Sequence, residues 1–127
     1  KRGLCYSVRA DTEMWSDGGD FSIYVGTDPK RYREAITVIH QVIDAAKTDA
    51  ELLARAKEVT LGRLALSFES TAQIISSAAQ DVALLGHTRG YEEIEKEIRS
   101  IEISDIQHAV ETCLEPKKMK TIMLLPK

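Results

Sequence analysis

The stretch Asp20–Pro29 reads Asp-Phe-Ser-Ile-Tyr-Val-Gly-Thr-Asp-Pro, and within it the residue pattern changes from that of a strand to that of a helix. Apolar side chains alternate with others through 20–26, which predicts a half-buried strand. Apolar residues then recur every three or four positions, as in a helix. Asp28 can cap the start of this helix, and Pro29 suits its first position. The stretch therefore predicts a strand followed by a helix that runs to Ala46 and lies on the sheet.

Alternation over Leu4–Ala10 predicts an earlier strand that pairs with 20–26 in an antiparallel hairpin. The polar link between the strands ends in Asp17-Gly18-Gly19, where glycines make positive φ angles accessible. We expect a long loop here, with Trp15 folded back over the sheet rather than contacting a ligand.

Three further helices are marked by capping boxes, and one short acidic helix covers Tyr91–Arg99. The boxes begin at Thr48, Ser70 and Ser104. The first helix runs toward Phe68, the second stops at Gly86, and the third is ended by Pro116 with Cys113 on its buried side.

The apolar run within 120–125 predicts a third strand, covered on both faces or centrally placed. Strands and helices occur in blocks rather than in regular alternation, so we predict an α+β fold with helices packed on a mainly antiparallel sheet. Residues 1–127 form one domain without linkers or repeats. Three strands are few for so many helices, so we expect this domain to be truncated at its amino terminus.

Composition excludes several classes of protein. The chain has 127 residues, 43% of them hydrophobic, a content that predicts a folded domain whose hydrophobic core needs no metal or disulfide. The 17 basic and 20 acidic residues give a net charge of −3, which argues against nucleic acid or an anionic membrane as partner. No signal peptide is recognisable at Lys1. Two cysteines, Cys5 and Cys113, favour free thiols in the cytoplasm, with one long-range disulfide as the alternative.

Few residues have the spacing of a catalytic or metal site. The histidines are isolated, and we interpret them as solvated surface. His108, Glu111 and Glu115 could be imagined as a metal cluster, but we interpret them and the acidic run 92–97 as solvated surface too. Cys5 lies beside basic residues but has no histidine nearby as a base. Tyr6 is the best candidate, because a phenol can donate a hydrogen bond to an oxyanion, although a packing role is more common for a strand tyrosine.

The segment Arg2-Gly3-Leu4-Cys5-Tyr6-Ser7-Val8 resembles the zinc peptidases of the pitrilysin and insulinase family, especially the branch of mitochondrial processing peptidase. The likeness continues through four later segments. These are Phe21–Pro29, Thr48–Lys57, Leu64–Ser70 ahead of a helix ending at Gly86, and Ile98–Leu114, followed by the closing strand to Pro126.

The resemblance implies a carboxy-terminal part of the half that lacks the zinc motif His-x-x-Glu-His, within an endopeptidase whose homologous halves enclose a chamber. Tyr6 matches a family tyrosine that binds the scissile carbonyl. Its partner arginine is expected before Lys1, so Arg2 is not a substitute. Zinc is expected in the other half, and no cofactor in this chain.

The implied partners are the zinc-bearing half or subunit and a peptide substrate, and the chain by itself is not expected to be catalytically competent. Two alternatives stay open: a noncatalytic structural or substrate-recognition subunit of the same fold, and a freestanding α+β interaction domain. We also expect the isolated chain to associate with itself, because a truncated sheet leaves an edge uncovered.

Overall fold

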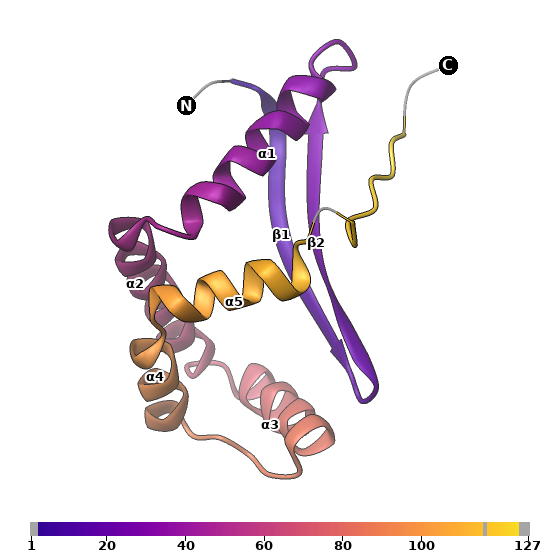
Figure 1. Ribbon diagram of the computed structural model, residues 1–127. Coiled ribbons are helices and arrows are strands. Elements are labelled where there is room, and N and C mark those ends of the chain that lie inside the picture. The colour runs from indigo at the N-terminus through magenta and orange to yellow at the C-terminus, as the bar shows by residue number, and fades with distance from the viewer. Residues whose placement is uncertain (1–2, 116, 125–127) are drawn as a thin grey trace.

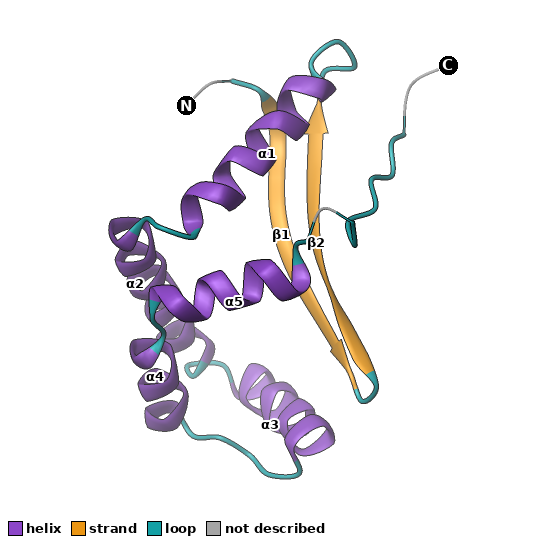
Figure 2. Ribbon diagram, viewed as in Figure 1, coloured by secondary structure: helices purple, strands orange, loops and turns teal. Residues whose placement is uncertain are grey.

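The computed structural model describes residues 3–115 and 117–124, which form a hairpin followed by helices (Figures 1 and 2). This order of elements confirms the predicted α+β class. In chain order the elements are β1 (Cys5–Trp15), β2 (Gly18–Thr27), α1 (Tyr32–Ala46), α2 (Ala50–Ser67), α3 (Thr71–Leu85), α4 (Tyr91–Ser100) and α5 (Ile103–Cys113).

The hairpin is longer than the sequence pattern predicted. β1 continues to Trp15 and turns through residues 16 and 17 only, so the predicted long loop is wrong. Trp15 pairs with Gly18 at the hairpin tip and is 54% exposed, so it does not fold back over the sheet. Gly19 is required by close approach, because a Cβ there would lie 2.7 Å from the Glu13 carbonyl oxygen. Gly19 thus serves the strand pairing, and neither it nor Gly18 adopts a positive φ.

One face of the hairpin is apolar, and α1 lies alongside the hairpin (Figure 1). The pairs on the apolar face are Val8 with Val25, Ala10 with Ile23 and Thr12 with Phe21. α1 contacts β2, which confirms the predicted helix-on-sheet contact, and its Ala35 is one of two buried apolar residues in the described chain. The other is Leu61 of α2, a helix that contacts α4.

The helix ends follow the predicted capping logic with shifts of a few residues. Asp49 accepts a hydrogen bond from the Leu52 amide at 2.8 Å, and Gly86 ends α3 at a φ of 79°. α1 begins at Tyr32 rather than at Pro29, because Asp28 accepts from the Lys30 amide at 2.7 Å and closes a separate turn first. The box that starts α5 pairs Glu102 with Asp105, so the predicted start at Ser104 is wrong by two residues.

Two predictions for the last part of the chain are wrong. Residues 120–124 form no strand, and the rest of that predicted strand lies outside the described residues, as does Pro116. A strand needs a neighbouring edge to hydrogen-bond, and no such pairing holds Ile122 or Leu124, both of which are almost fully exposed. Cys113 is also exposed rather than buried, because it lies on the open side of the last turn of α5.

The fold leaves much of its surface uncovered. The chain exposes 10218 Å², whereas a compact monomer of this mass exposes about 6,800 Å². Several apolar side chains of α2 and α3 are exposed, among them Leu66, Ile75 and Val82. The self-contained core expected from composition is therefore not formed by the described residues. Among them, no helix has the length and apolarity required to cross a membrane.

Candidate functional site

Tyr6 lies at an irregularity near the start of β1. Cys5 pairs with Thr27 and Ser7 pairs with Gly26, so Tyr6 is one extra residue without an opposite partner. Such a β-bulge redirects side chains and bends its strand, and it breaks the strict alternation predicted for Leu4–Ala10. Tyr6 is 83% exposed, and no hydrogen bond to its hydroxyl is seen among the described residues. The phenol is therefore free to donate to a ligand.

The pairs next to the bulge place a second phenol beside a cation. Ser7 lies opposite Gly26, where a Cβ would come within 2.8 Å of the Ser7 hydroxyl oxygen. Two pairs further along the hairpin, the Arg9 guanidinium lies over the Tyr24 ring, 5.3 Å from its centroid. Tyr24 is itself half-exposed, so this end of the hairpin carries two phenols on neighbouring strands. The sequence pattern singled out only Tyr6, because the pairing of Tyr24 with Arg9 is decided by the strand register.

Two side chains hold the backbone that leads into Tyr6. The Thr27 hydroxyl donates to the Leu4 carbonyl oxygen at 2.6 Å, and Arg31 Nη1 donates to the Gly3 carbonyl oxygen at 2.9 Å. Gly3 has a φ of +54°, which glycine adopts readily. Neither Thr27 nor Arg31 was identified from the sequence, since their partners are more than 20 positions away along the chain.

The other predicted candidates do not assemble into a site. Cys5 and Cys113 are free, exposed thiols. His87 Nδ1 lies 3.2 Å from the Leu85 carbonyl oxygen, at the end of α3. Throughout the described part of the chain, no three His, Cys, Asp or Glu side chains are grouped closely enough to hold a metal ion. The described residues therefore do not fit zinc.

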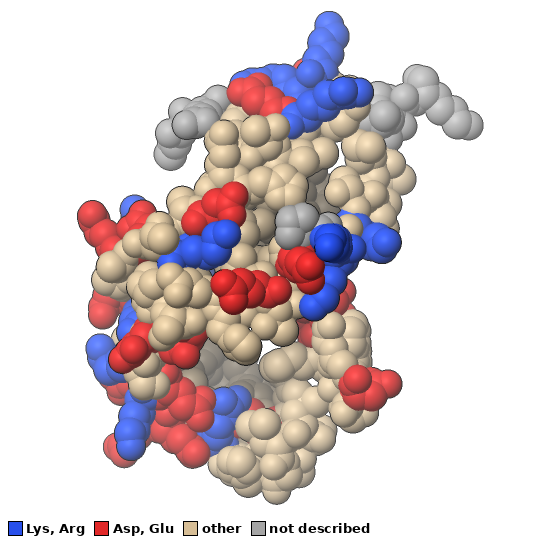
Figure 3. Space-filling view, in the orientation of Figure 1, with Lys and Arg blue, Asp and Glu red and all other residues tan. Residues whose placement is uncertain are grey.

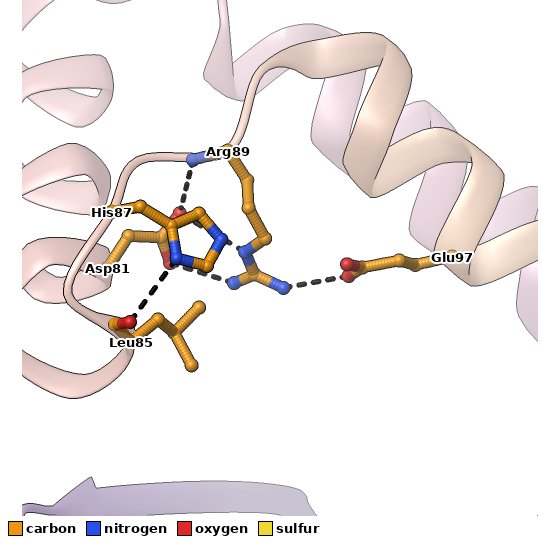
Figure 4. A network of polar contacts seen from close by, with 5 residues as sticks. All are labelled: Asp81, Leu85, His87, Arg89 and Glu97. Atoms are coloured by element: carbon orange, nitrogen blue, oxygen red, sulfur yellow. Dashed lines mark hydrogen bonds and ion pairs between the residues drawn. The ribbon is translucent and has the colours of Figure 1, made fainter.

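A polar network that the sequence pattern did not reveal connects α3 to α4 (Figure 4). Arg89 forms a two-point contact with Asp81, with Nη2 donating to Oδ1 at 2.8 Å and Nε donating to Oδ2 at 3.2 Å. The Arg89 amide donates to the same carboxylate, and Nη1 donates to Glu97 at 2.7 Å. Asp81 is only 6% exposed and is the one buried charged residue among those described. All its partners come from Arg89, so this network is structural.

The network also changes the protonation of its members. The side-chain hydrogen bonds from Arg89 lower the pKa of Asp81 against the opposing effect of desolvation, and the same contact raises the pKa of Arg89. On α1, the Lys47 ammonium lies 2.7 Å from Asp44 and lowers the pKa of that exposed carboxyl. Both shifts keep a carboxylate ionised, which is the opposite of what a general acid requires.

The acidic run on α4 forms ordinary surface ion pairs, in agreement with its interpretation as solvated surface. Glu95 accepts from Arg99 at 2.8 Å on the same helix, and Glu97 is the outer partner of Arg89. In the space-filling view, acidic and basic side chains are mixed over the α2 and α4 side of the molecule (Figure 3). These charges create no field of a single sign on the face shown.

An open hollow of about 430 Å³ lies between α2 and α4, and its lining offers both charges. Lys57 donates to the Arg99 carbonyl oxygen at 2.8 Å, which ties the two helices together across the hollow. Its rim is open to solvent, and two of its lining residues, Arg99 and Glu58, form an exposed ion pair with each other. Its lining residues are Glu51, Ala54, Arg55, Lys57, Glu58 and Arg99. We therefore take the bulge at Tyr6 as the candidate site.

Comparison with known proteins connects this hairpin to peptidases. Residues 1–60, which contain the hairpin, match the family described as the peptidase M16 inactive domain. The uncharacterized zinc protease YmxG of Bacillus subtilis is 29% identical over 83% of this chain and 26% of its own length. An uncharacterized zinc protease of Mycobacterium leprae is 26% identical, and one of Mycobacterium tuberculosis is 25% identical; each is matched by 83% of this chain, over 24% and 25% of its own length.

These findings confirm the similarity to the carboxy-terminal part of the pitrilysin and insulinase peptidases. The chain spans about a quarter of the length of the curated relatives that it matches.

Proposed function

We propose that this chain forms part of the half of a zinc endopeptidase that lacks the metal site, and that its Tyr6 binds the substrate. The proposal assigns zinc to the other half and a peptide to the space between the halves. The mitochondrial processing peptidase branch is the proposed relationship within the family. Cytoplasm is the proposed compartment, because both cysteines are free thiols.

The exposed phenol of Tyr6 is the observation that carries the proposal. The bulge removes Tyr6 from the regular pairing, and its side chain is 83% exposed. During hydrolysis of a peptide bond, negative charge develops on the carbonyl oxygen. A phenol positioned to donate a hydrogen bond there stabilises the transition state more than the ground state. Tyr6 is thus assigned the role of a hydrogen-bond donor to the developing oxyanion.

The test uses the peptidase with both halves present and compares two tyrosines of the hairpin. Tyr6→Phe removes the donor and keeps the ring, and we expect kcat/KM for a peptide substrate to fall by about 100-fold. Tyr24→Phe is the matched control, because it removes a half-exposed phenol from the neighbouring strand. Unchanged hydrolysis in Tyr6→Phe, or an equal loss in both variants, contradicts the proposed role.

A noncatalytic subunit of the same fold is the second candidate, and the large exposed surface favours it as much as it favours a peptidase half. Such a chain would use the uncovered hairpin and helix faces to bind a neighbouring subunit. The Tyr6→Phe variant of the assembled protein distinguishes the two functions, since a structural or recognition subunit is expected to leave any peptide hydrolysis insensitive to this substitution.

A further inference from the structure

The bulge raises the question of what holds Tyr6 in place. In a regular strand, the cross-strand ladder fixes the direction of each side chain. Tyr6 has no opposite residue in the register, so the ladder does not fix it directly. A donor that stabilises a transition state must nevertheless be held close to its productive geometry. Some other contact has to supply this constraint.

Thr27 and Arg31 contact the two peptide groups that lead into the bulge. Thr27 is the last residue of β2 and pairs with Cys5, the residue immediately before Tyr6. Its hydroxyl reaches one position further and donates to the Leu4 carbonyl oxygen at 2.6 Å in a partly buried contact. Arg31 donates to the preceding carbonyl, that of Gly3, at 2.9 Å. Two consecutive carbonyls are thus tied to the end of β2 and to the connection that leads from it to α1.

Arg31 is held in turn by a carboxylate on α1. Its Nε donates to Glu34 Oε2 at 3.2 Å, and its amide donates to the Asp28 carbonyl oxygen at 2.8 Å. The connection that carries Thr27 and Arg31 is therefore itself ordered by hydrogen bonds. On the other side of the bulge, Ser7 is paired with Gly26, whose lack of a Cβ leaves room for the Ser7 hydroxyl. The bulge is constrained on both sides.

We infer that Thr27 is a positioning residue for Tyr6, and that it acts through the Leu4 carbonyl with Arg31 as its support. The inference rests on the proposed function of Tyr6 and extends it to side chains that do not touch substrate. Thr27 holds the strand just before the bulge and thereby sets the direction of the phenol. Its hydroxyl, rather than its methyl group, makes the contact.

A double-mutant cycle in the assembled peptidase tests this inference. Thr27→Val keeps the shape of the side chain and removes the hydroxyl. We expect kcat to fall about tenfold with little change in KM, because a displaced donor stabilises the transition state less and leaves substrate binding unchanged. Thr27→Ser restores the hydroxyl and is expected to recover most of the rate. In the Tyr6→Phe background, Thr27→Val is expected to cause no further loss.

Thr37→Val is the matched control, because the Thr37 hydroxyl donates to the Arg33 carbonyl at 3.0 Å within α1, away from the bulge. It removes one hydroxyl-to-carbonyl bond and is expected to leave kcat unchanged. A loss of the same size for Thr27→Val with and without the Tyr6 hydroxyl would show general damage to the fold and overturn the positioning role. So would full activity of Thr27→Val while Tyr6→Phe is impaired.

The outcomes separate the two proposals. Failure of Tyr6→Phe to lower kcat/KM rejects the function proposed for Tyr6, and the catalytic role of Thr27 with it. A strong Tyr6→Phe effect without coupling to Thr27 rejects only the positioning role. NMR resonances of the Tyr6 ring supply a readout independent of activity: they are expected to shift in Thr27→Val and to return in Thr27→Ser. Unchanged resonances in Thr27→Val would overturn the inference.

Discussion

Two connections in this molecule depend on an arginine, and they use it differently. Between β2 and α1, Arg31 donates to an uncharged backbone carbonyl at an exposed strand end. Between α3 and α4, Arg89 binds a buried carboxylate through two side-chain nitrogens and its own amide. A carbonyl needs no counter-charge, whereas a buried carboxylate is costly without one. The first contact can orient a site at little cost to stability, and the second is needed for the helices to stay together.

The two connections also differ in their surroundings, since the one at Arg31 lies beside the uncovered hairpin, and the largest expected effect is on the association of the chain through that hairpin. The chain exposes about 3,400 Å² more than a compact monomer of its mass, and a standard interface buries only about 800 Å² per partner. We therefore expect the isolated chain to associate with a second copy through the apolar hairpin face, and light scattering at high protein concentration measures this. Val8→Lys places a charge on this exposed face and is expected to give monomer.

Ile75→Lys on α3 is the control for association, because Ile75 is equally exposed but lies outside the hairpin. It is expected to leave the dimer intact. A wild-type chain that stays monomeric at high concentration contradicts the prediction, and loss of the dimer in Ile75→Lys moves the contact to the helices.

Removal of each arginine is the next test. Arg89→Met leaves the buried Asp81 carboxylate without its partner, so we expect thermal unfolding, followed by circular dichroism, to shift down by several degrees. Arg31→Met leaves only a carbonyl that solvent can reach, and a much smaller shift is expected. Equal shifts in the two variants would remove the distinction drawn between the two connections.

Substitution of two glycines by alanine is expected to change the free energy of unfolding by a smaller amount, downward at Gly19 and upward at Gly62. In Gly19→Ala, the new methyl group meets the Glu13 carbonyl oxygen across the hairpin, so we expect a loss of about 1–3 kcal/mol in the free energy of unfolding. Gly62 lies inside α2 with open space around it, and Gly62→Ala is expected to stabilise by about 0.5–1 kcal/mol. Urea denaturation of both variants measures the difference, and destabilisation by Gly62→Ala would contradict this description of α2.

The smallest effect is confined to acid. Because Arg89 lowers the pKa of Asp81 in the folded chain, the stabilisation is fully present above the pKa of an unfolded aspartate, about 3.9, and is lost as pH falls through the folded value. The midpoint of thermal unfolding is expected to decrease below about pH 4. Asp81→Asn should reduce this decrease, whereas Thr27→Val should not, since neither Thr27 nor its carbonyl partner titrates. An identical acid dependence in Asp81→Asn would contradict the assignment.

The fold could be predicted from the sequence wherever the signal is local. Ser70 caps α3 and Gly86 ends it, both as predicted, and α2 is capped by Asp49, one residue after the predicted Thr48. Failures occurred where a neighbour decides the outcome. The run at 120–124 has the composition of a strand but pairs with no strand edge. The hairpin extends to Trp15 because the polar residues near its tip are paired with residues of the opposite strand.

The candidate site shows the same division. Tyr6 was identified from its residue type and from a resemblance, both of which are properties of the sequence. The bulge that exposes it depends on strand register, and Thr27 and Arg31 reach it across 23 and 28 positions. The Asp81–Arg89 contact likewise joins a helix to a later connection, so no periodicity predicts it.

The sequence by itself determined the strand and helix periods, both ends of α3 and the presence of a phenol at position 6, because these depend on side chains close together in the chain. Only the tertiary structure decided that Tyr6 stands outside the regular pairing, that Thr27 and Arg31 hold the strand before it, and that Asp81 is buried against Arg89. Those features arise from contacts between distant segments, and their energies exist only after the chain has brought the segments together.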